Sequence, residues 1–277
     1  MLTIVAAMEQ ELARLREVLG GRTGAVGREV LATADLHVIG VGRSAAGTAV
    51  CSLIERQGMV GDGSPSPEGL LLLGFAGGVA PALEAGTLVL SSRYYRQEPA
   101  CSPNSTEERA GDYLAPDPEM LRQGIQAATA AGQRWAKADS LTVDHLVATL
   151  EAKEAIRLRY PVGIVEMEDY WVAAAARKAG VPFLSARVVL DAADHPLPGY
   201  LMGLSRSRFR AAVTVAAMPW RIPALLGLAR RLPLAQKALT GFATAFLGQL
   251  AGAEPARPRL EPPSSAIPAG PGGSLHG

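Results

Sequence analysis

Acidic side chains follow apolar runs at three distant places in the chain. They are the carboxylates of residues 7–11 (AMEQE), those of residues 166–169 (EMED), and Asp191 at the end of PFLSARVVLD. Carboxyl groups can give a proton to a leaving group and can stabilise a developing positive charge. In an open α/β sheet the ligand site lies beyond the carboxyl ends of the strands, so the three clusters are candidates for one site.

Each cluster also has a plain structural explanation. The acids of residues 7–11 complement the dipole of a following helix, which is worth roughly 0.3 to 1 kcal/mol. Asp169 could cap a helix, and Asp191 could form a turn. Glu166 and Glu168 are harder to explain in this way, because an ionised carboxylate at a buried strand terminus requires partners. The hydroxyl groups of a ribose are suitable partners.

The other motifs are too weak to predict a cofactor or a metal. The glycine clusters GVGR (40–43) and GFAGG (74–78) let the backbone approach a ligand closely, but GVGRSAAG lacks the full GxGxxG pattern of a dinucleotide site. The Asp-His pair at 194–195 has no second histidine nearby, and Cys51 and Cys101 have no metal-binding spacing. We therefore expect no metal and no cofactor.

Apolar runs alternate with helical patterns over most of the chain, which has 277 residues and 48% hydrophobic side chains. Helices are expected after Met8, after Arg43, at 117–132, at 148–159 and at DYWVAAAARKAG. Strands are expected at LTIVAAM, twice within 28–41, and at LLLLGFAGG, TLVLSSRYY, 136–143, VGIVEME and PFLSARVVLD. This order predicts an α/β fold with a central mixed, largely parallel sheet flanked by helices. The polar segment 97–112 predicts a long loop that could act as a lid.

The charge balance changes after Asp194. Residues 1–194 carry 24 acidic and 18 basic side chains, whereas residues 195–253 carry 7 basic and no acidic ones. Proline-separated amphipathic helices are expected there, at 204–217, 219–231 and 234–250. Such a basic segment could lie on an anionic membrane surface, or it could pack on the body or on a second subunit.

The composition also indicates how the chain is organised and where it acts. The predicted parts are an α/β domain over 1–203, a basic amphipathic helical extension over 204–252 and a disordered tail over 253–277. The N-terminal run has no positive n-region and becomes charged by Glu9, so neither a signal peptide nor a membrane anchor is expected. We therefore expect a cytoplasmic protein that binds no nucleic acid.

Taken in order, the motifs resemble those of the nucleoside phosphorylase and nucleosidase superfamily, most closely the methylthioadenosine/S-adenosylhomocysteine nucleosidases. The similarity extends from Leu2 to about Asp194. Five segments carry it: AMEQE (7–11), GVGR (40–43), AGG (76–78), VEME (165–168) and DAAD (191–194). Each is common alone, but all five in this order are specific.

The resemblance implies a role for each matched residue. Glu11 would hold or activate an attacking water, and Asp191 would protonate N7 of a purine base. Glu168 would bind the ribose 2′- and 3′-hydroxyls, and Met167 would pack against the sugar. The remaining implied substrate-binding residues are Glu166, Ala76, Gly77, Leu146 and Val147. Breaking an N-glycosidic bond passes through a cation-like sugar, so negative charge near the ring and a proton for the base are both needed.

The chain departs from the family pattern at two positions, and the first of them bears on the nucleophile. Phe75 stands where the nucleosidases have a serine before AGG, and Leu190 replaces the usual serine before the catalytic aspartate. Gly42 and Arg43 are then the nearest candidates for a phosphate or other anion site. The sequence therefore favours hydrolysis over phosphorolysis, with both reactions still open.

The segments TVDHLVAT, VVLDAADHPLP and PWRIPALLGLARRLPLAQKAL resemble the hopanoid-biosynthesis members of the superfamily, which remove adenine from adenosylhopane. The resemblance implies a nucleosidase that releases adenine from a 5′-substituted nucleoside, with a lipid-linked nucleoside as one candidate substrate, and that works as a homodimer. The alternative is a catalytically silent relative that binds a nucleoside or a membrane.

Overall fold

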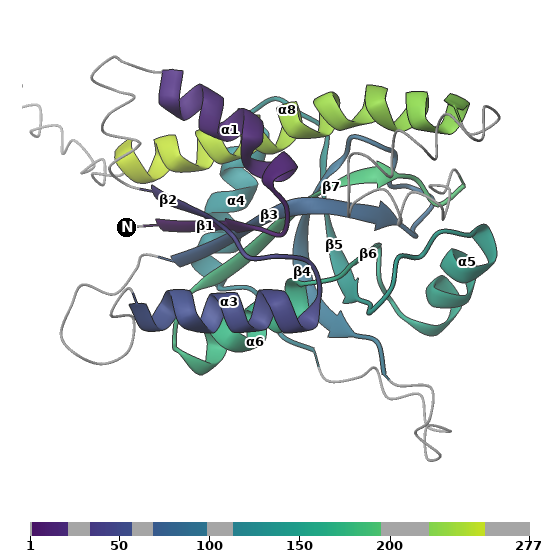
Figure 1. The fold of residues 1–277 in the computed structure, drawn as a ribbon, viewed down its shortest axis with the longest axis horizontal. Coiled ribbons are helices and arrows are strands. Elements are labelled where there is room, and N and C mark those ends of the chain that lie inside the picture. Colours follow the sequence, from purple (N-terminus) through teal and green to yellow (C-terminus); the bar gives the residue numbers. More distant parts are fainter. Residues whose placement is uncertain (1, 22–33, 57–68, 99–112, 195–221, 253–277) are drawn as a thin grey trace, which may run out of the picture.

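The computed structural model describes residues 2–21, 34–56, 69–98, 113–194 and 222–252 (Figure 1). Its elements are β1 (Leu2–Ala6), α1 (Glu9–Gly21), β2 (Ala34–Val38), α3 (Arg43–Arg56), β3 (Gly69–Gly78), β4 (Leu88–Arg96), α4 (Pro118–Ala130), β5 (Trp135–Thr142), α5 (Leu150–Arg159), β6 (Ile164–Glu166), α6 (Asp169–Lys178), β7 (Phe183–Asp191) and α8 (Ile222–Gly252). The first strand expected within 28–41, most of the 97–112 loop, the helix at 204–217 and the tail lie outside the described residues.

Seven strands form one sheet in the order β2-β1-β3-β6-β5-β4-β7, and β3 also pairs with β7. Because of this extra pairing, β3, β6, β5, β4 and β7 form a closed ring (Figure 1). The pairs β1–β2, β1–β3, β3–β7, β4–β5 and β5–β6 are parallel, and β3–β6 and β4–β7 are antiparallel. The prediction of a mixed, largely parallel sheet flanked by helices is confirmed.

The short strand β6 runs in an unexpected direction. It is antiparallel to the end of β3, with Val165 opposite Gly77 and Ile164 opposite Gly78. The chain that leaves β6 therefore turns back along β3 toward Gly74, whose neighbour on β7 is Arg187. This reversal brings the acidic segment after Val165 beside the middle of β7, and not beyond the end of a parallel strand.

Helices cover the sheet from two sides. The helices α1, α4 and α8 lie on one side and contribute to a single large core cluster with β1, β3, β4 and β7 (Figure 1). The helices α3 and α6 contact each other on the other side and bury Val50, Leu53, Val172 and Ala176. The heptad-like spacing of Leu12, Leu15 and Leu19 explains why α1 packs its apolar face inward, since all three side chains are buried.

The C-terminal helix differs from the prediction. Separate helices were expected on either side of Pro233, but α8 continues through this proline from Ile222 to Gly252. Pro233 lies on the exposed side of the helix, where the carbonyl that loses its backbone partner can bond to water. Two hydrogen bonds to the body flank it, from Arg231 to the carbonyl of Leu190 (3.3 Å) and from Gln236 to the carbonyl of Gln10 (2.7 Å).

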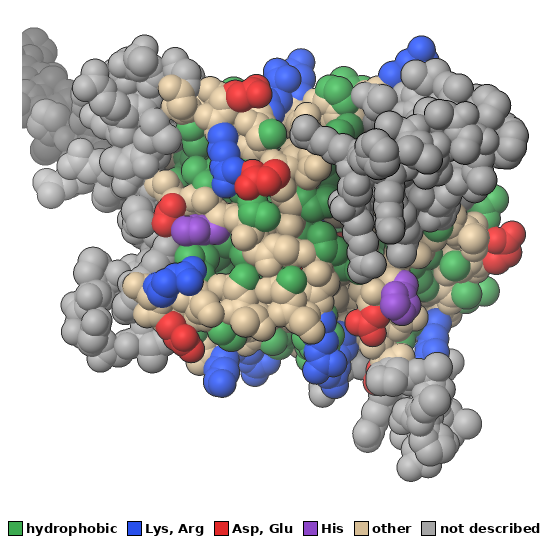
Figure 2. Space-filling view, in the orientation of Figure 1, with side chains coloured by type: hydrophobic (Ala, Val, Ile, Leu, Met, Phe, Trp, Pro, Cys, Tyr) green, Lys and Arg blue, Asp and Glu red, His purple; other side chains and the backbone are tan. Residues whose placement is uncertain are grey.

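The apolar face of α8 is part of the protein core. Leu239, Phe242, Phe246 and Leu247 are buried in the same cluster as α1 and α4. Of the two alternatives for the basic segment, packing on the body therefore holds for this stretch. Among the described residues, no helix combines the length and apolar character needed to cross a membrane. Figure 2 shows positive and negative side chains interspersed on the described part of one face.

Replacing Phe242 with alanine should lower the free energy of unfolding by about 3 to 5 kcal/mol, because it leaves a cavity where α8 meets the core. Urea unfolding monitored by circular dichroism measures the change. Leu234 on the same helix is 64% exposed and serves as the control, since its change to alanine should alter stability by less than roughly 0.5 kcal/mol. Equal losses in the two variants would contradict this packing.

Candidate active site

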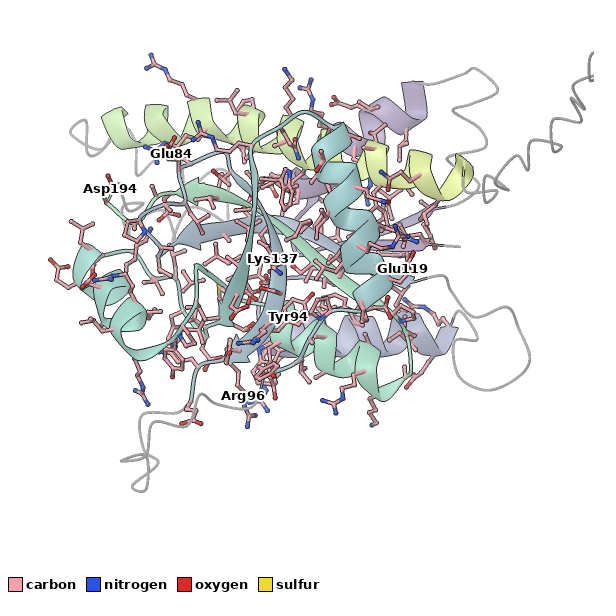
Figure 3. The ribbon with its side chains drawn as sticks, turned by 180° about the vertical axis from the view of Figure 1, so that it is seen from behind. Glu84, Tyr94, Arg96, Glu119, Lys137 and Asp194 are labelled. Carbon is pink, nitrogen blue, oxygen red and sulfur yellow. The ribbon has the colours of Figure 1, made fainter. Side chains whose placement is uncertain are left out.

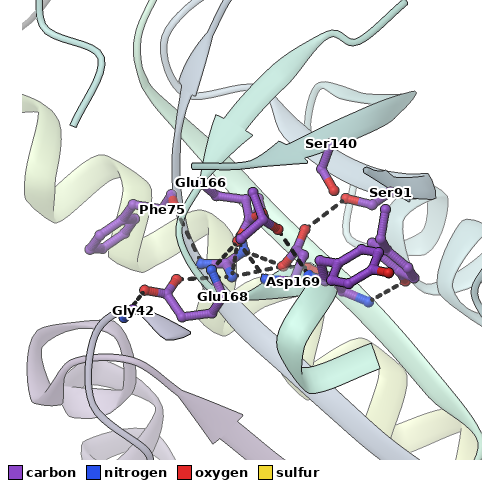
Figure 4. Close-up of polar contacts among 12 residues, drawn as sticks. Gly42, Phe75, Ser91, Ser140, Glu166, Glu168 and Asp169 are labelled. Atoms are coloured by element: carbon purple, nitrogen blue, oxygen red, sulfur yellow. Dashed lines mark hydrogen bonds and ion pairs between the residues drawn. The ribbon is translucent and has the colours of Figure 1, made fainter. Parts of the chain in front are cut away.

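Arg187 occupies the centre of a buried cluster of carboxylates (Figure 4). It lies in the middle of β7 and is 1% exposed, so its charge must be balanced inside the protein. Its Nη2 atom lies 2.7 Å from Asp169 Oδ1, 3.0 Å from Glu166 Oε2 and 3.3 Å from Glu168 Oε2. Burial lowers the pKa of Arg187, but Asp169, Glu166 and Glu168 together raise it above its ordinary value. The guanidinium is therefore a permanent cation.

Glu166 holds the start of α6 in place. Its Oε2 atom accepts hydrogen bonds from the backbone N–H groups of Glu168 and Asp169, both at 2.6 Å. Its other oxygen shares a short hydrogen bond with the hydroxyl of Thr142. Burial and the neighbouring Asp169 carboxylate raise the pKa of Glu166. The carboxylate is fully enclosed and bonded within the protein, so in this structure it has protein partners where ribose hydroxyls were expected.

Asp169 does not cap α6, as one interpretation of the sequence expected. The N-cap position is Glu168, which makes no side-chain capping bond, and Glu166 supplies the acceptor instead. The Asp169 carboxylate points into the core, where it accepts hydrogen bonds from Ser185 Oγ (2.7 Å) and Arg187 Nε (2.9 Å). The surplus of acid at 166–169 is thus explained by the buried cation that it neutralises.

Glu168 connects this cluster to the glycine turn before α3. Its Oε1 atom accepts a hydrogen bond from the backbone N–H of Gly42 at 3.0 Å, and its Oε2 atom faces Arg187 (Figure 4). Gly40 and Gly42 both have φ of +83°, a conformation that other residues rarely adopt. The GVGR turn is therefore built so that its backbone can bond to the carboxylate of the residue before α6.

Glu11 lies on the other side of the same cluster. Its oxygens accept hydrogen bonds from the backbone N–H groups of Met8 (2.8 Å) and Phe75 (2.9 Å). A side chain at Gly74 would lie 2.2 Å from Arg187 Nη1 and 2.9 Å from Glu11 Oε1, so only glycine allows both groups to approach β3. Burial raises the pKa of Glu11 to about 7, against the lowering effect of Arg187. Glu11 can therefore accept a proton near neutral pH.

Asp191 ends β7 beside Gly77, three residues along β3 from Gly74. A Cβ atom added at Gly77 would lie 3.3 Å from Asp191 Oδ1. Asp191 Oδ2 is 2.5 Å from Nζ of Lys153, and both side chains are almost fully buried. Figure 3 shows Asp194, just beyond this strand, at the opposite end of the molecule from Glu119 in α4. Glu11 and Asp191 thus lie beside Gly74 and Gly77 of β3, and Glu168 is linked to this region through Arg187.

Of the residues predicted to contact base and sugar, some pack in apolar clusters and one is exposed. Met167 and Val147 pack against one apolar cluster that includes Val79 and Val165, next to Gly77. Ala76 is buried in a separate apolar cluster with Leu83 and Val189, whereas Leu146 is 38% exposed. An apolar surface therefore borders the carboxylates, as a purine ring and a sugar edge would require.

At the candidate anion site, the positive charge of Arg43 lies against an aromatic ring. The guanidinium of Arg43 lies 4.4 Å from the ring centroid of Trp171, a cation–π arrangement. Phe75, in the place of the expected serine, offers no hydroxyl, and its backbone N–H bonds to Glu11. In the described part of the chain, no group of three or more histidine, cysteine, aspartate or glutamate side chains is arranged to hold a metal ion.

Sequence reasoning missed two residues of the site, Arg187 and Lys153. A lone arginine inside the apolar run PFLSARVVLD is a signal of a buried ion pair, because a central strand excludes an unpaired charge. Lys153 is three residues before Ile156 on α5, and these two are the buried residues of that helix. The spacing placed Lys153 on the inner face, but nothing in the sequence indicated its partner.

Known proteins share the fold of this chain. The structure resembles the 5′-methylthioadenosine/S-adenosylhomocysteine nucleosidase of Neisseria meningitidis in complex with methylthio-immucillin-A, with 20% identity, 89% of this chain and 97% of that chain covered, and a TM-score of 0.63. It also resembles the futalosine hydrolase of Helicobacter pylori, with 15% identity, coverages of 88% and 96%, and a TM-score of 0.63. At these identities the similarity establishes a shared fold. The family model of the phosphorylase superfamily matches residues 2–237, and the protein therefore belongs to the phosphorylase superfamily.

Proposed function

We propose that this protein hydrolyses the N-glycosidic bond of a 5′-substituted adenine nucleoside and releases adenine. The observation that carries the proposal is that Glu11 and Asp191 lie beside the end of β3, while Glu168 faces the Arg187 side chain that approaches the same strand at Gly74. These carboxylates come from three distant segments of the chain. Their assembly at one edge of the sheet is what an enzyme that stabilises a ribosyl cation would need.

Each carboxylate has a different part in the proposed reaction. Glu168, held by Gly42 and Arg187, would accept hydrogen bonds from the ribose 2′- and 3′-hydroxyls as positive charge develops on the ring. Glu11 would take a proton from the attacking water. Asp191, at the other end of the group, would deliver a proton to N7 of the departing base. Met167 and Val147 would provide the apolar surface for sugar and base.

The surroundings of the site favour water over phosphate as the nucleophile. Two buried carboxylates, Glu11 and Glu168, face this region, and their negative charge would repel a phosphate ion. Arg187 is already neutralised by three acids, and Arg43 stacks on Trp171. Adenine release should therefore proceed at the same rate with and without phosphate.

The activity should rise as the pH increases through about 7. Glu11 must be ionised to accept a proton from water, and its pKa, raised by burial, is about 7. Protonation below this value removes the base, so kcat/KM for adenine release should fall toward pH 5. Measurement between pH 5 and pH 8 in a constant-ionic-strength buffer tests the expectation. A flat profile over this range would exclude Glu11 as the base.

A panel of adenosine derivatives tests the function itself. The purified protein is incubated with methylthioadenosine, S-adenosylhomocysteine, adenosine, inosine and adenosylhopane in vesicles, and free base is measured by chromatography with and without phosphate. Adenosylhopane is included because residues 195–253 contain no acidic side chain, which suits a lipid-linked substrate. Release of adenine supports the proposal. Tight binding of a nucleoside without any release of base would instead identify a catalytically silent relative.

A further inference from the structure

Lys153 is a buried lysine whose ammonium group bonds to oxygen atoms at the end of β7. It projects from α5, and only 2% of it is exposed. Its Nζ atom donates to Asp191 Oδ2 (2.5 Å), to the backbone carbonyl of Asp191 (3.2 Å) and to the carbonyl of Ala192 (2.9 Å). An ammonium group has three N–H donors, and these three acceptors match them. The site is therefore built for a charged lysine beside Asp191.

This pairing changes what Asp191 can do. A carboxylate that faces an ammonium at 2.5 Å is favoured in its ionised form, and an ionised carboxylate has no proton to give. The proton that a leaving base requires is instead on the lysine. Transfer of this proton from Lys153 to Asp191 makes both groups neutral, and Asp191 then holds a proton that it can donate.

We propose that Lys153 is a positioning residue that supplies Asp191 with the proton taken up by the leaving base. This inference rests on the proposed function. The C1′–N9 bond breaks and its electron pair moves into the purine. The Lys153 ammonium gives a proton to the Asp191 carboxylate, and the carboxyl group formed in this way gives its proton to N7. Water adds its oxygen to C1′ and gives a proton to Glu11.

After the reaction the neutral amine of Lys153 must recover a proton from solvent, and the structure offers a route. A hollow of about 170 Å³ lies on the outer side of this residue, with a lining of Val79, Pro81, Leu150, Lys153, Glu154, Arg157 and Ala193. Lys153 therefore touches both Asp191 and a solvent-filled depression at the surface. Helix α5 and Asp194 lie at the same end of the molecule (Figures 1 and 3).

The other charged groups described near the Lys153–Asp191 pair are exposed or bonded elsewhere, so the proton given to Asp191 comes from Lys153. On α5, Glu154 and Arg157 bond to each other (Oε2 to Nε, 2.8 Å) at the rim of the hollow. Beyond β7 the nearby acid is Asp194, which is exposed, and on α8 Arg231 bonds to the carbonyl of Leu190. Glu166 of β6 and Glu168 just after it face Arg187, and β3 carries no titratable side chain. Among the described residues, Lys153 and Asp191 thus form a buried ion pair at this end of β3.

Lys153 could supply a proton or could only support the structure, and the pH profile of adenine release by the Lys153→Met variant distinguishes these two roles. Without the ammonium, Asp191 must hold the proton alone, and a carboxyl group loses its proton at lower pH than an ammonium does. The loss in kcat/KM should therefore be small near pH 5.5 and should grow to about 10²-fold near pH 9. Lys178, an exposed lysine at the end of α6, is changed to methionine as the control and should follow the wild type at every pH.

A second substrate and a second variant complete the test. A 4-nitrophenyl riboside releases a phenolate that needs no proton, so the defect of the Lys153→Met variant should largely disappear with it. Lys153→Gln, which keeps a hydrogen-bond donor, should show the same pH dependence if the methionine variant does not fold. If the Lys153→Met variant loses activity equally at all pH values, or equally on the nucleoside and the nitrophenyl substrate, the inference about Lys153 is wrong but the proposed function still stands. A wild-type enzyme that releases no base from any nucleoside would overturn the proposed function and this inference together.

Discussion

Replacing Arg187 with methionine should lower the free energy of unfolding by about 3 to 5 kcal/mol, the range found when one partner of a buried ion pair is removed. The substitution keeps the length of the side chain but leaves Glu166, Glu168 and Asp169 without their shared cation. The mutual repulsion of these carboxylates then opposes folding. Thermal and urea unfolding of the purified variant measure the effect.

The pH dependence of this variant identifies the cause. Without Arg187, the buried acids would be relieved by taking up protons, and the pKa of Glu166, already raised by burial, would rise further in the folded state. Stability linked to a raised pKa is present at low pH and is lost as the pH rises. The stability deficit should therefore be largest at pH 8 and smaller at pH 5. The exposed Arg177 of α6, changed to methionine, is the control and should have little effect. A deficit below roughly 1 kcal/mol at pH 8 would show that the cluster does not depend on its cation.

Replacing Asp191 with asparagine should reduce kcat for adenine release by about 10²-fold or more, because the side chain can no longer carry a proton to the base. Asparagine keeps an oxygen that can accept a hydrogen bond from Lys153, so the shape of the strand end is preserved. Substrate binding should change less than turnover, since the contacts of Glu168 are not affected. Steady-state kinetics on the best substrate of the panel give both quantities.

The control for this experiment is Asp35→Asn on β2. Asp35 is half-exposed and pairs with His37 on the far edge of the sheet, away from the carboxylate group. Its variant should retain the wild-type rate. Thermal melting of both variants shows whether a loss of activity comes from unfolding. Undiminished turnover in a well-folded Asp191→Asn variant would remove this residue from the mechanism.

Much of the fold was predictable because its signals are local. The uninterrupted apolar run from Leu70 and the run from Phe183 became adjacent central strands, and Leu12, Leu15 and Leu19 correctly predicted the buried face of α1. Pro233 was misleading. Proline predicts a helix break from backbone chemistry alone, but the packing of α8 on both sides of this residue outweighs one lost hydrogen bond.

The site was predictable in its carboxylates but not in its cations. Glu11, Glu168 and Asp191 follow apolar runs, and a pattern along the chain can reveal that position. The partner of a buried charge depends on the order of the strands in the sheet, and local sequence patterns do not reveal this order. Arg187 meets Glu166 because β6 runs antiparallel to β3, and Lys153 meets Asp191 because α5 packs against the end of β7. No local sequence pattern indicates the direction of β6 or the position of α5.

The two hydrogen bonds from α8 to the body affect the order in which the enzyme can be assembled during synthesis. Gln236 bonds to the carbonyl immediately before Glu11, and Arg231 bonds to the carbonyl immediately before Asp191. The ribosome makes these two acids first and the helix that secures their backbone last. A nascent chain that stops before residue 222 therefore contains every proposed reactive group but lacks the helix that fixes them. Translation must proceed through α8 before the enzyme can work.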